Sequence, residues 1–418
     1  MPKDTISSSF VDMNNLEMSN EVKPLFDKVV KHIKENVDPI SDEFYKLAEE
    51  NENRWHLNER QLELLEGAKN KAKESGLWNF FLPNAETGEG LSNLDYAYIA
   101  AELGKNPLAS ETLNCSAPDT GNMEVLERVG TPEQKEKWLK PLLNGEIRSC
   151  YGMTEPAVAS SDAKNISTSA RLVGNEWVIN GEKHYISGAG DPRCRIMITM
   201  VVTNPDAPKH LRQSQILVPL PHPGVEVLRP MFVYGKDDAP HGHMHIKFDN
   251  VRVPKENMIL GEGRGFEISQ GRLGPGRIHH CMRSIGVAER ALDLLCKRAV
   301  SRTAFGKPLA ELGGNYDIIA DSRIELDMCR LAVLRAAYMM DTIGNKEARK
   351  YISQIKVSVP NMTLKIIDRA IQIHGALGVS QDTPLAAMWT SQRTLRLADG
   401  PDEVHRRLIA REELKNYQ

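Results

Sequence analysis

The sequence has 418 residues, of which 41% are hydrophobic and 26% are charged, and its formal net charge at pH 7 is −3. A chain of this length exceeds one ordinary domain, and its composition is that of a globular protein rather than a disordered or fibrous one. The nearly balanced charge gives no electrostatic basis for binding nucleic acid or an anionic membrane surface.

The sequence shows no signal for export or membrane insertion. The first 15 residues, MPKDTISSSFVDMNN, lack the apolar run of a signal peptide, and no apolar run of about 18 residues predicts an integral membrane segment. The six cysteines are scattered without CxxC spacing, which indicates reduced thiols. We therefore expect a cytoplasmic protein.

Residues 1–146 have the pattern of a helical domain. From Val22 to Ile33, apolar residues recur at spacings of three and four, as on one face of a helix. A second helical run over 58–75 ends before Gly76, and Ser92 begins a capping pattern for the next helix. We expect an N-terminal α-helical domain.

In residues 147–262 the hydrophobic period changes to two, which predicts strands over 195–202, 215–219, 224–228 and 243–248. The Asn180-Gly181 pair between two β-rich runs predicts a hairpin turn. No strand–helix alternation occurs, so we expect a compact antiparallel barrel or sandwich rather than a Rossmann unit.

Two features of this middle segment suggest ligands. The loop after Tyr151 is rich in hydroxyls and small residues, so its backbone N–H groups can cradle a pyrophosphate. His241, His243 and His245 alternate along one strand, which makes a metal site conceivable. No carboxylate or further histidine follows at a telling spacing, so we predict no metal.

Residues 263–418 are again helical. Apolar periodicity predicts helices over roughly 277–302 and 316–343, a third around 352–373, and a fourth that starts at Thr383-Pro384. Four amphipathic helices joined by short loops predict a C-terminal four-helix bundle.

Several motifs resemble the acyl-CoA dehydrogenase family. They are Tyr151-Gly-Met-Thr-Glu-Pro156, Asn180-Gly-Glu-Lys-His-Tyr-Ile-Ser187, Arg302-Thr-Ala-Phe305-Gly, Gln372-Ile-His-Gly375 and Ala398-Asp-Gly400. The motifs are most similar to those of the subgroup of family members 10 and 11, and the resemblance does not include the kinase-like domain of that subgroup. The resemblance implies the same order of domains, FAD as cofactor and an acyl-CoA substrate.

The resemblance also implies site residues. Asp399 occupies the position of the catalytic base, commonly Glu in the family, and its alternative interpretation is a turn-forming Asp-Gly pair before a helix. The implied cofactor-binding residues are Tyr151, Met153, Thr154, Ser160, Tyr185, Ser187, Arg302, Phe305, Gln372, Gly375, Pro401 and Glu403. The implied substrate-binding residues are Ser161, Gly274, Arg277 and Gly400.

The function implied is α,β-desaturation of an acyl-CoA to a trans-2-enoyl-CoA in fatty-acid or related acyl-CoA catabolism. Asp399 would take the α-proton and the flavin N5 the β-hydride, while the Asp399 N–H and a flavin ribityl hydroxyl polarise the thioester oxygen. An electron-transfer flavoprotein would reoxidise the flavin, and motifs that reach a neighbouring subunit imply a homodimer or homotetramer. A same-fold flavin oxidase and a non-catalytic acyl-CoA-binding scaffold remain the alternatives.

Overall fold

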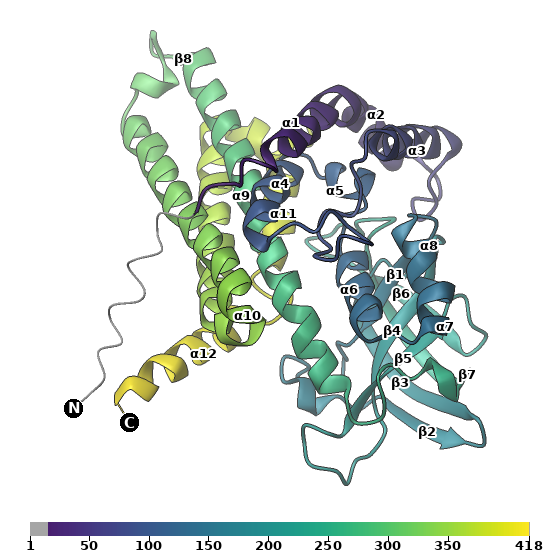
Figure 1. Ribbon diagram of the computed structural model, residues 1–418. Helices are drawn as coiled ribbons and strands as arrows, with labels where there is room; N and C mark the ends of the chain where they lie inside the picture. The colour runs from purple at the N-terminus through teal and green to yellow at the C-terminus, as the bar shows by residue number, and fades with distance from the viewer. Residues whose placement is uncertain (1–15, 418) are drawn as a thin grey trace. The chain divides into compact units, whose positions relative to one another are not determined.

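The computed structural model describes residues 16–417, which divide into two compact units (Figure 1). The first unit contains the described residues up to Asp38, together with Pro83–Ser110 and those of Arg277–Gln418. The second unit contains Pro39–Leu82 and Glu111–Gly276. Between residues 16 and 417, every helix is too short or too polar to span a membrane.

The first unit is helical. Within it, α10 packs against α4, α11 and α12, and α1 packs against α4. The Asp341 carboxylate of α10 accepts hydrogen bonds from the backbone N–H groups of Asn93 and Leu94, at 2.9 and 3.0 Å. These bonds satisfy donors at the start of α4 and fix it to α10. The helices are α1 (Lys23–His32), α4 (Asn93–Lys105), the first-unit part of α9 (Gly265–Ser301), α10 (Asn315–His374), α11 (Leu385–Thr394) and α12 (Asp402–Leu414).

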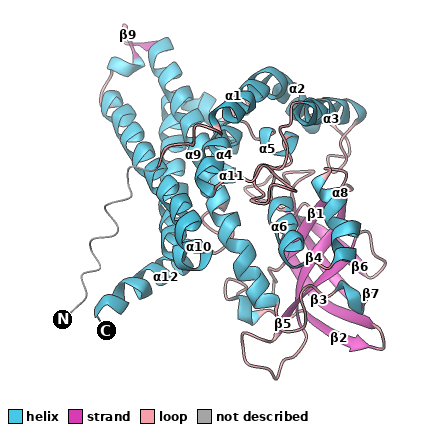
Figure 2. Cartoon of the chain, viewed as in Figure 1, coloured by secondary structure: helices cyan, strands magenta, loops and turns pink. Residues whose placement is uncertain are grey.

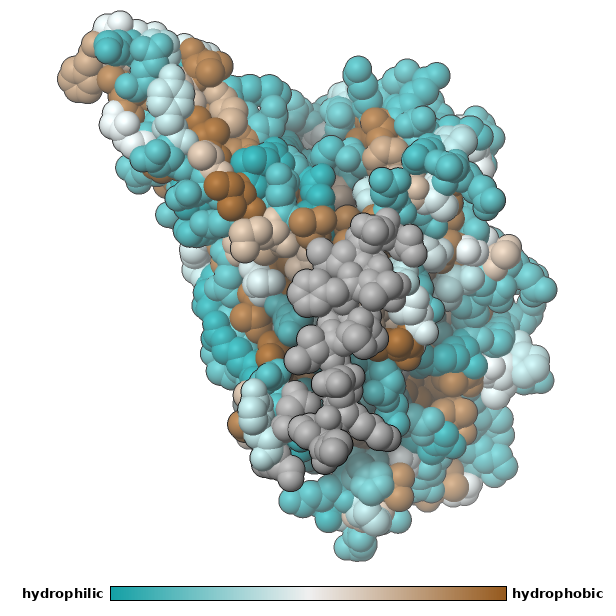
Figure 3. All heavy atoms as spheres, turned by 60° about the vertical axis from the view of Figure 1, so that its left-hand side comes forward, coloured by the Kyte–Doolittle hydropathy of each residue, from teal (hydrophilic) through white to brown (hydrophobic). Residues whose placement is uncertain are grey.

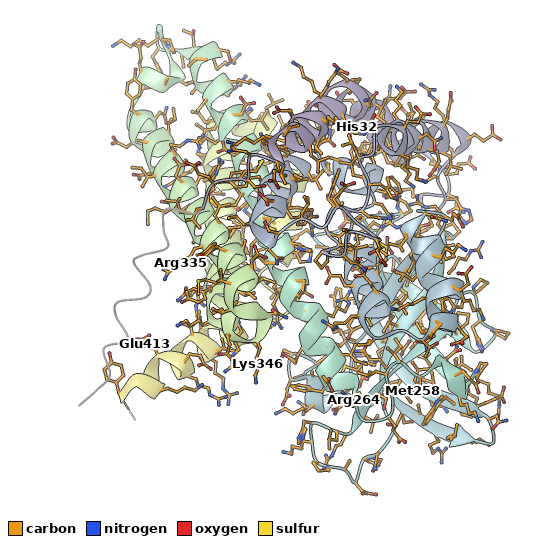
Figure 4. The ribbon with its side chains drawn as sticks, viewed as in Figure 1. His32, Met258, Arg264, Arg335, Lys346 and Glu413 are labelled. Atoms are coloured by element: carbon orange, nitrogen blue, oxygen red, sulfur yellow. The ribbon has the colours of Figure 1, made fainter. Side chains whose placement is uncertain are left out.

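Helix α10 consists of two helices joined at Gly344, whose φ of 79° and ψ of 162° are not helical. This break matches the expected end of one helix near Ile343 and the start of another. Lys346 is exposed just beyond the break (Figure 4). The positive φ explains why glycine occupies the junction.

Helix α9 is longer than the sequence pattern predicted, because it begins at Gly265 and not near Arg277. Its early turns contain glycines and Pro275, which are residues that disfavour the interior of a helix. Burial of Ile268 and Leu273, at 1% and 7% exposure, stabilises these turns as helix. Arg264 precedes them (Figure 4) and bonds to Glu267 at 2.8 Å.

The second unit combines helices with a seven-stranded sheet (Figure 2). The strand order is β1-β4-β2-β3-β7-β6, and β5 pairs with β4. Most pairs are antiparallel, but β4 pairs in parallel with β1 and, at one position, with β2, whereas the sequence predicted an antiparallel barrel or sandwich. The strands are β1 (Arg148–Gly152), β2 (Ser169–Val173), β3 (Glu176–Ser187), β4 (Cys194–Val202), β5 (Gln213–Pro219), β6 (Val225–Met231) and β7 (His243–Pro254).

The helices of this unit are α2 (Asp38–Glu50), α3 (Glu59–Glu74), α5 (Ala109–Thr112), α6 (Asp119–Val129), α7 (Pro132–Gln134) and α8 (Lys140–Leu143). The boundary between the units falls within two of them, so this unit contains α2 from Pro39 and α5 from Glu111. Helix α6 packs against β1. The sheet encloses a core of apolar side chains that includes Trp177, Ile179, Phe248 and Val251.

On the face of the protein that Figure 3 draws, hydrophobic side chains are interspersed among hydrophilic ones.

The predicted hairpin at Asn180-Gly181 is wrong. These two residues lie inside β3, where Asn180 pairs with Ser169 and Gly181 pairs with Phe248 across a register shift. The turn lies instead between β2 and β3, at Gly174 with φ 64°. Gly181 has φ 145°, and a Cβ there would come within 2.9 Å of Thr168. The glycine therefore serves a β-bulge and not a turn.

All six cysteines lie within the described residues, and none forms a disulfide.

Candidate functional site

The predicted base, Asp399, lies in a turn between α11 and α12 in the first unit. Asp399 has φ 55° and Gly400 has φ 98°, so two successive residues adopt left-handed backbone conformations. Such conformations persist only where neighbouring groups hold them. The Asp399 side chain is 20% exposed.

Arg277 holds the main chain of this turn. Its Nε donates a hydrogen bond to the carbonyl oxygen of Asp399 over 2.8 Å. Burial lowers the pKa of Arg277, and the Asp399 carboxylate opposes that shift. The guanidinium remains a cation, because an arginine does not lose its proton in a protein. The predicted substrate-binding Arg277 and the predicted base Asp399 are therefore adjacent.

Two further residues support the same turn. The fully buried Lys356 of α10 donates to the carbonyl oxygen of Leu395 and, at 3.4 Å, to that of Gly400. His405 of α12 contacts Ser353 at 3.1 Å and lies against Gly400, where an added Cβ would be 3.1 Å from its Nε2. Gly400 is thus required both for its φ and for the space beside His405.

A histidine that the sequence analysis assigned no role lies beside the Asp399 carboxylate. The Nε2 atom of His280 is 3.4 Å from Asp399 Oδ2. Burial lowers the pKa of His280, although its hydrogen bond to Asp399 opposes this. His280 follows Arg277 by three positions on α9, so both lie on one helix face. That spacing was visible in the sequence and indicates a shared helix face, but it does not show the contact with Asp399 that gives His280 its role.

The remaining first-unit predictions lie at exposed positions. The loop after α9 forms a two-stranded hairpin of β8 (Thr303–Ala304) and β9 (Lys307–Pro308), with Phe305 and Gly306 at its tip. Phe305 is 97% exposed, and Arg302 beside the hairpin is also exposed. Gln372 lies in the last turn of α10, and Gly375 is the C-cap residue of that helix.

The other two predicted residues of this unit lie at the start of α12. Pro401 is the N-cap residue, and the exposed Glu403 follows it in the first turn. An acidic side chain at this position is favourable for the helix dipole on its own account.

In the second unit, the residues after β1 form the predicted cofactor loop. Thr154 and Ser161 are exposed and Met153 is half-buried. The Ser160 hydroxyl accepts a hydrogen bond from the Glu155 N–H at 2.8 Å, so it stabilises the loop. The residues with exposed side chains are those available to a ligand.

Tyr151 precedes this loop and its side chain has internal partners. Its hydroxyl lies 3.0 Å from Ser269 Oγ and accepts from Gln215 at 3.0 Å. The Arg272 guanidinium stacks 3.9 Å from the centre of the Tyr151 ring. The predicted substrate-binding Gly274 follows Arg272 by two positions and is buried within α9.

A buried ion pair between Lys183 and Glu155 anchors the loop that follows β1. Lys183 is fully buried, and its Nζ donates to Glu155 at 2.8 Å and to the Met153 carbonyl at 3.0 Å. The Glu155 carboxylate also accepts from the backbone N–H groups of Ser167 and Thr168, at 2.8 and 2.9 Å. Burial alone would raise the pKa of Glu155, but Lys183 and these bonds lower it to about 2. The carboxylate is therefore ionised and the loop is fixed at both ends.

Strand β3 supplies an exposed aromatic ring beside a hydroxyl. Tyr185 has φ 54° and is 47% exposed, an uncommon combination for a strand aromatic. The Ser187 hydroxyl contacts His243 Nδ1 at 2.8 Å, and His245 contacts Glu182 at 2.9 Å. Within residues 16–417, no three His, Cys, Asp or Glu side chains are grouped to hold a metal ion.

Three family models match the chain in order. The N-terminal domain model of acyl-CoA dehydrogenase matches residues 20–146, the middle-domain model 150–251 and the C-terminal domain model 263–414. The chain belongs to the acyl-CoA dehydrogenase family. This is a family of FAD-dependent oxidoreductases with an N-terminal helical, a middle β and a C-terminal helical domain, as the sequence resemblance implied.

Curated relatives support the membership. Acyl-CoA dehydrogenase family member 10 of Mus musculus is 52% identical over 404 residues, which cover 96% of this chain and 37% of that protein. Family member 11 of Gallus gallus is 52% identical, over 93% of this chain and 50% of that protein. The chain thus spans half or less of these two relatives. The probable acyl-CoA dehydrogenase FadE2 of Mycobacterium tuberculosis is 54% identical to this chain. By contrast with the first two relatives, its match covers most of both proteins, 84% of this chain and 86% of FadE2.

A solved structure has the same fold along nearly the whole chain. An acyl-CoA dehydrogenase homologue from Mycobacterium abscessus, 49% identical, superposes with a TM-score of 0.93 over 96% of this chain and 100% of that one. A glutaryl-CoA dehydrogenase of Mycobacterium smegmatis in complex with FADH2 shares the fold at 20% identity and a TM-score of 0.78.

The exposed groups of the second unit fit the chemistry of FAD. The isoalloxazine ring needs an aromatic or apolar face and hydrogen-bonding partners at its edge, which Tyr185 and the Thr154 hydroxyl offer. The loop that carries Thr154 is anchored by the buried Lys183–Glu155 pair, so these groups are preorganised. The donor set therefore suits the family's cofactor.

Proposed function

We propose that the protein is an FAD-dependent acyl-CoA dehydrogenase that converts an acyl-CoA thioester to a trans-2-enoyl-CoA in fatty-acid or related acyl-CoA catabolism. The observation that supports this most strongly is the hydrogen bond from Arg277 to the Asp399 carbonyl, in a turn with two left-handed residues. Such a conformation is costly, and it presents a partly exposed carboxylate where the family has its base.

In this proposal, Asp399 removes the α-proton of the thioester. Its own backbone N–H lies in the fixed turn and donates to the thioester oxygen, which stabilises developing enolate charge. FAD, when bound, supplies the acceptor for the hydride that leaves the β-carbon. Arg277 and Gly400, with Ser161 and Gly274 of the second unit, are the residues we assign to substrate binding.

We assign FAD binding to the residues that the family resemblance implies. Thr154, Met153, Tyr185 and Ser187 contribute from the second unit, where Tyr151 and Ser160 maintain the loop. Arg302, Phe305, Gln372, Gly375, Pro401 and Glu403 contribute from the first. A guanidinium such as that of Arg302 suits a pyrophosphate, because it donates two parallel hydrogen bonds.

A homo-oligomer accounts for the exposed apolar surface of the first unit. Phe305, Ile324 and Met328 are 97%, 56% and 65% exposed, and the last two lie one turn apart on α10. Exposed apolar stripes of this kind mark protein interfaces. A second subunit would cover these side chains, and Phe305 would contact the FAD bound to that subunit.

An electron-transfer flavoprotein is the electron acceptor that we propose. A cytoplasmic location stays a prediction.

The test is an anaerobic titration of the purified, FAD-loaded protein with acyl-CoAs of graded chain length. The proposal predicts that the oxidised flavin spectrum bleaches with one class of chain length. Fast reoxidation by air after bleaching would favour the oxidase alternative. Failure to retain FAD after reconstitution would contradict the proposal and favour the binding scaffold.

A further inference from the structure

The side chain and the main chain of Asp399 are held by different residues of α9. Arg277 bonds to the Asp399 carbonyl oxygen, whereas His280 lies 3.4 Å from the carboxylate oxygen Oδ2. The His280 side chain is 22% exposed, close to the 20% of Asp399, so the pair is largely shielded from water. The carboxylate therefore has a protein partner of its own.

The partner on the other side of the imidazole determines which nitrogen of His280 carries the proton. Arg283 Nη2 is 3.2 Å from His280 Nδ1. A guanidinium has donors and no acceptor, so Nδ1 must accept this bond. A neutral imidazole then carries its proton on Nε2, which faces Asp399 Oδ2. Burial lowers the pKa of His280 and so favours this neutral form.

We propose that His280 is a positioning residue that donates its Nε2–H to Asp399 and fixes the orientation of the carboxylate for proton abstraction. The inference rests on the proposed function, in which Asp399 is the base. A carboxylate rotates about the Cα–Cβ and Cβ–Cγ bonds even when its backbone is fixed. An error of about 1 Å in the position of a catalytic group can cost about 100-fold in rate. The chain Arg283–His280–Asp399 restricts this rotation.

Three variants test the inference by the rate of flavin reduction in a single turnover with the acyl-CoA that bleaches the wild type. His280→Leu removes the donor with a side chain of similar size, and we expect the rate to fall about 10- to 100-fold with unchanged acyl-CoA affinity. His280→Gln keeps an N–H near the place of Nε2, so it should restore most of the rate. His279→Leu is the matched control, because His279 is the adjacent α9 histidine and packs on Tyr96 at 4.9 Å.

A second measurement separates this inference from the proposed function, because it needs no reaction. In selectively 15N-histidine-labelled protein, NMR should show His280 as the Nε2–H tautomer, with an Nε2 shift that changes in Asp399→Ala. An Nδ1–H tautomer, or an Nε2 shift that is the same in Asp399→Ala, would overturn the inference even if no acyl-CoA bleaches the wild type. An unchanged rate in His280→Leu, or equal losses in His280→Leu and His280→Gln, would overturn it as well.

Discussion

The Nε atom of Arg277 donates to the main-chain oxygen of Asp399 across 2.8 Å, which joins a residue in the first half of α9 to the turn before α12. The two residues are 122 positions apart in the sequence. Tertiary structure therefore brings the predicted substrate residue directly to the predicted base. This contact fixes where the backbone of Asp399 lies.

We expect Arg277→Met to lower the rate of flavin reduction about 10- to 100-fold, because the Asp399 turn loses a charge-assisted hydrogen bond. Stopped-flow reduction with acyl-CoA measures the effect. Arg290→Met is the control, since Arg290 also lies on α9 and donates to a main-chain carbonyl, that of Lys105, at 2.9 Å. An equal loss of rate in both variants would show that the effect is only structural.

The buried pair Lys183–Glu155 predicts a large stability effect. Lys183→Met leaves a buried carboxylate without its cation, so the free energy of unfolding should fall by about 3–5 kcal/mol. The double variant Lys183→Met/Glu155→Gln should recover part of the loss, because it removes the unpaired charge. Denaturant unfolding measures both.

Loss of the Lys183–Glu155 pair should also weaken the binding of FAD. Release of the Met153 carbonyl from Lys183 should loosen the Thr154 loop, so FAD should dissociate more readily from Lys183→Met in equilibrium dialysis. Lys164→Met is the control, because Lys164 is a 41%-exposed partner of Asp162 at 3.9 Å and such pairs contribute little. Unchanged FAD affinity in Lys183→Met would contradict the anchoring role of the ion pair.

A buried histidine predicts sensitivity to acid. Burial lowers the pKa of His279 to about 3, whereas an unfolded chain has a value near 6.5. As the pH falls below about 6.5, the unfolded state takes up a proton that the folded state does not. The free energy of unfolding therefore falls with decreasing pH, by up to about 1.4 kcal/mol per pH unit from this group.

His279→Leu should make that slope shallower between pH 6.5 and pH 5, as measured by urea unfolding at several pH values. His210→Leu is a suitable comparison, because His210 is exposed in a loop and is not packed in the interior. If the slopes of wild type and His279→Leu coincide, the histidine is not buried in its neutral form.

Phe305 predicts a cofactor effect without a folding effect. Phe305 is 97% exposed within the single chain, so Phe305→Ala should leave the secondary structure of the subunit unchanged in circular dichroism. If the ring reaches the FAD of a second subunit, the variant should bind FAD more weakly and its oligomer should dissociate more easily in sedimentation experiments. Phe232→Ala, at a 62% exposed position in the second unit, should do neither.

Helix and strand periodicity predicted most elements because burial of one face determined them. The strand expected over 195–202 corresponds to β4 at Cys194–Val202, and the helix expected over 58–75 corresponds to α3 at Glu59–Glu74. Gly76 follows α3 with φ 70°, as its sequence signal indicated, whereas Asn58, which the prediction included in the helix, is its N-cap. Here local chemistry and burial agree.

Prediction failed where a tertiary contact overrode a local signal. Asn180-Gly181 favours a turn by propensity, but long pairing with β2 and β7 keeps both residues within β3. His280 and Lys356 escaped notice because their importance depends on contacts across α9, α10 and the Asp399 turn. Sequence spacing alone does not show such contacts.

The most direct test of the central claim compares the wild type with Asp399→Asn, each loaded with FAD, in anaerobic visible spectra during titration with acyl-CoA. The replacement keeps the size of the side chain but removes its ability to accept the α-proton. We predict that the wild-type flavin bleaches, whereas Asp399→Asn binds the same acyl-CoA and stays oxidised. Bleaching of Asp399→Asn at the wild-type rate would contradict the assignment of Asp399 as the base.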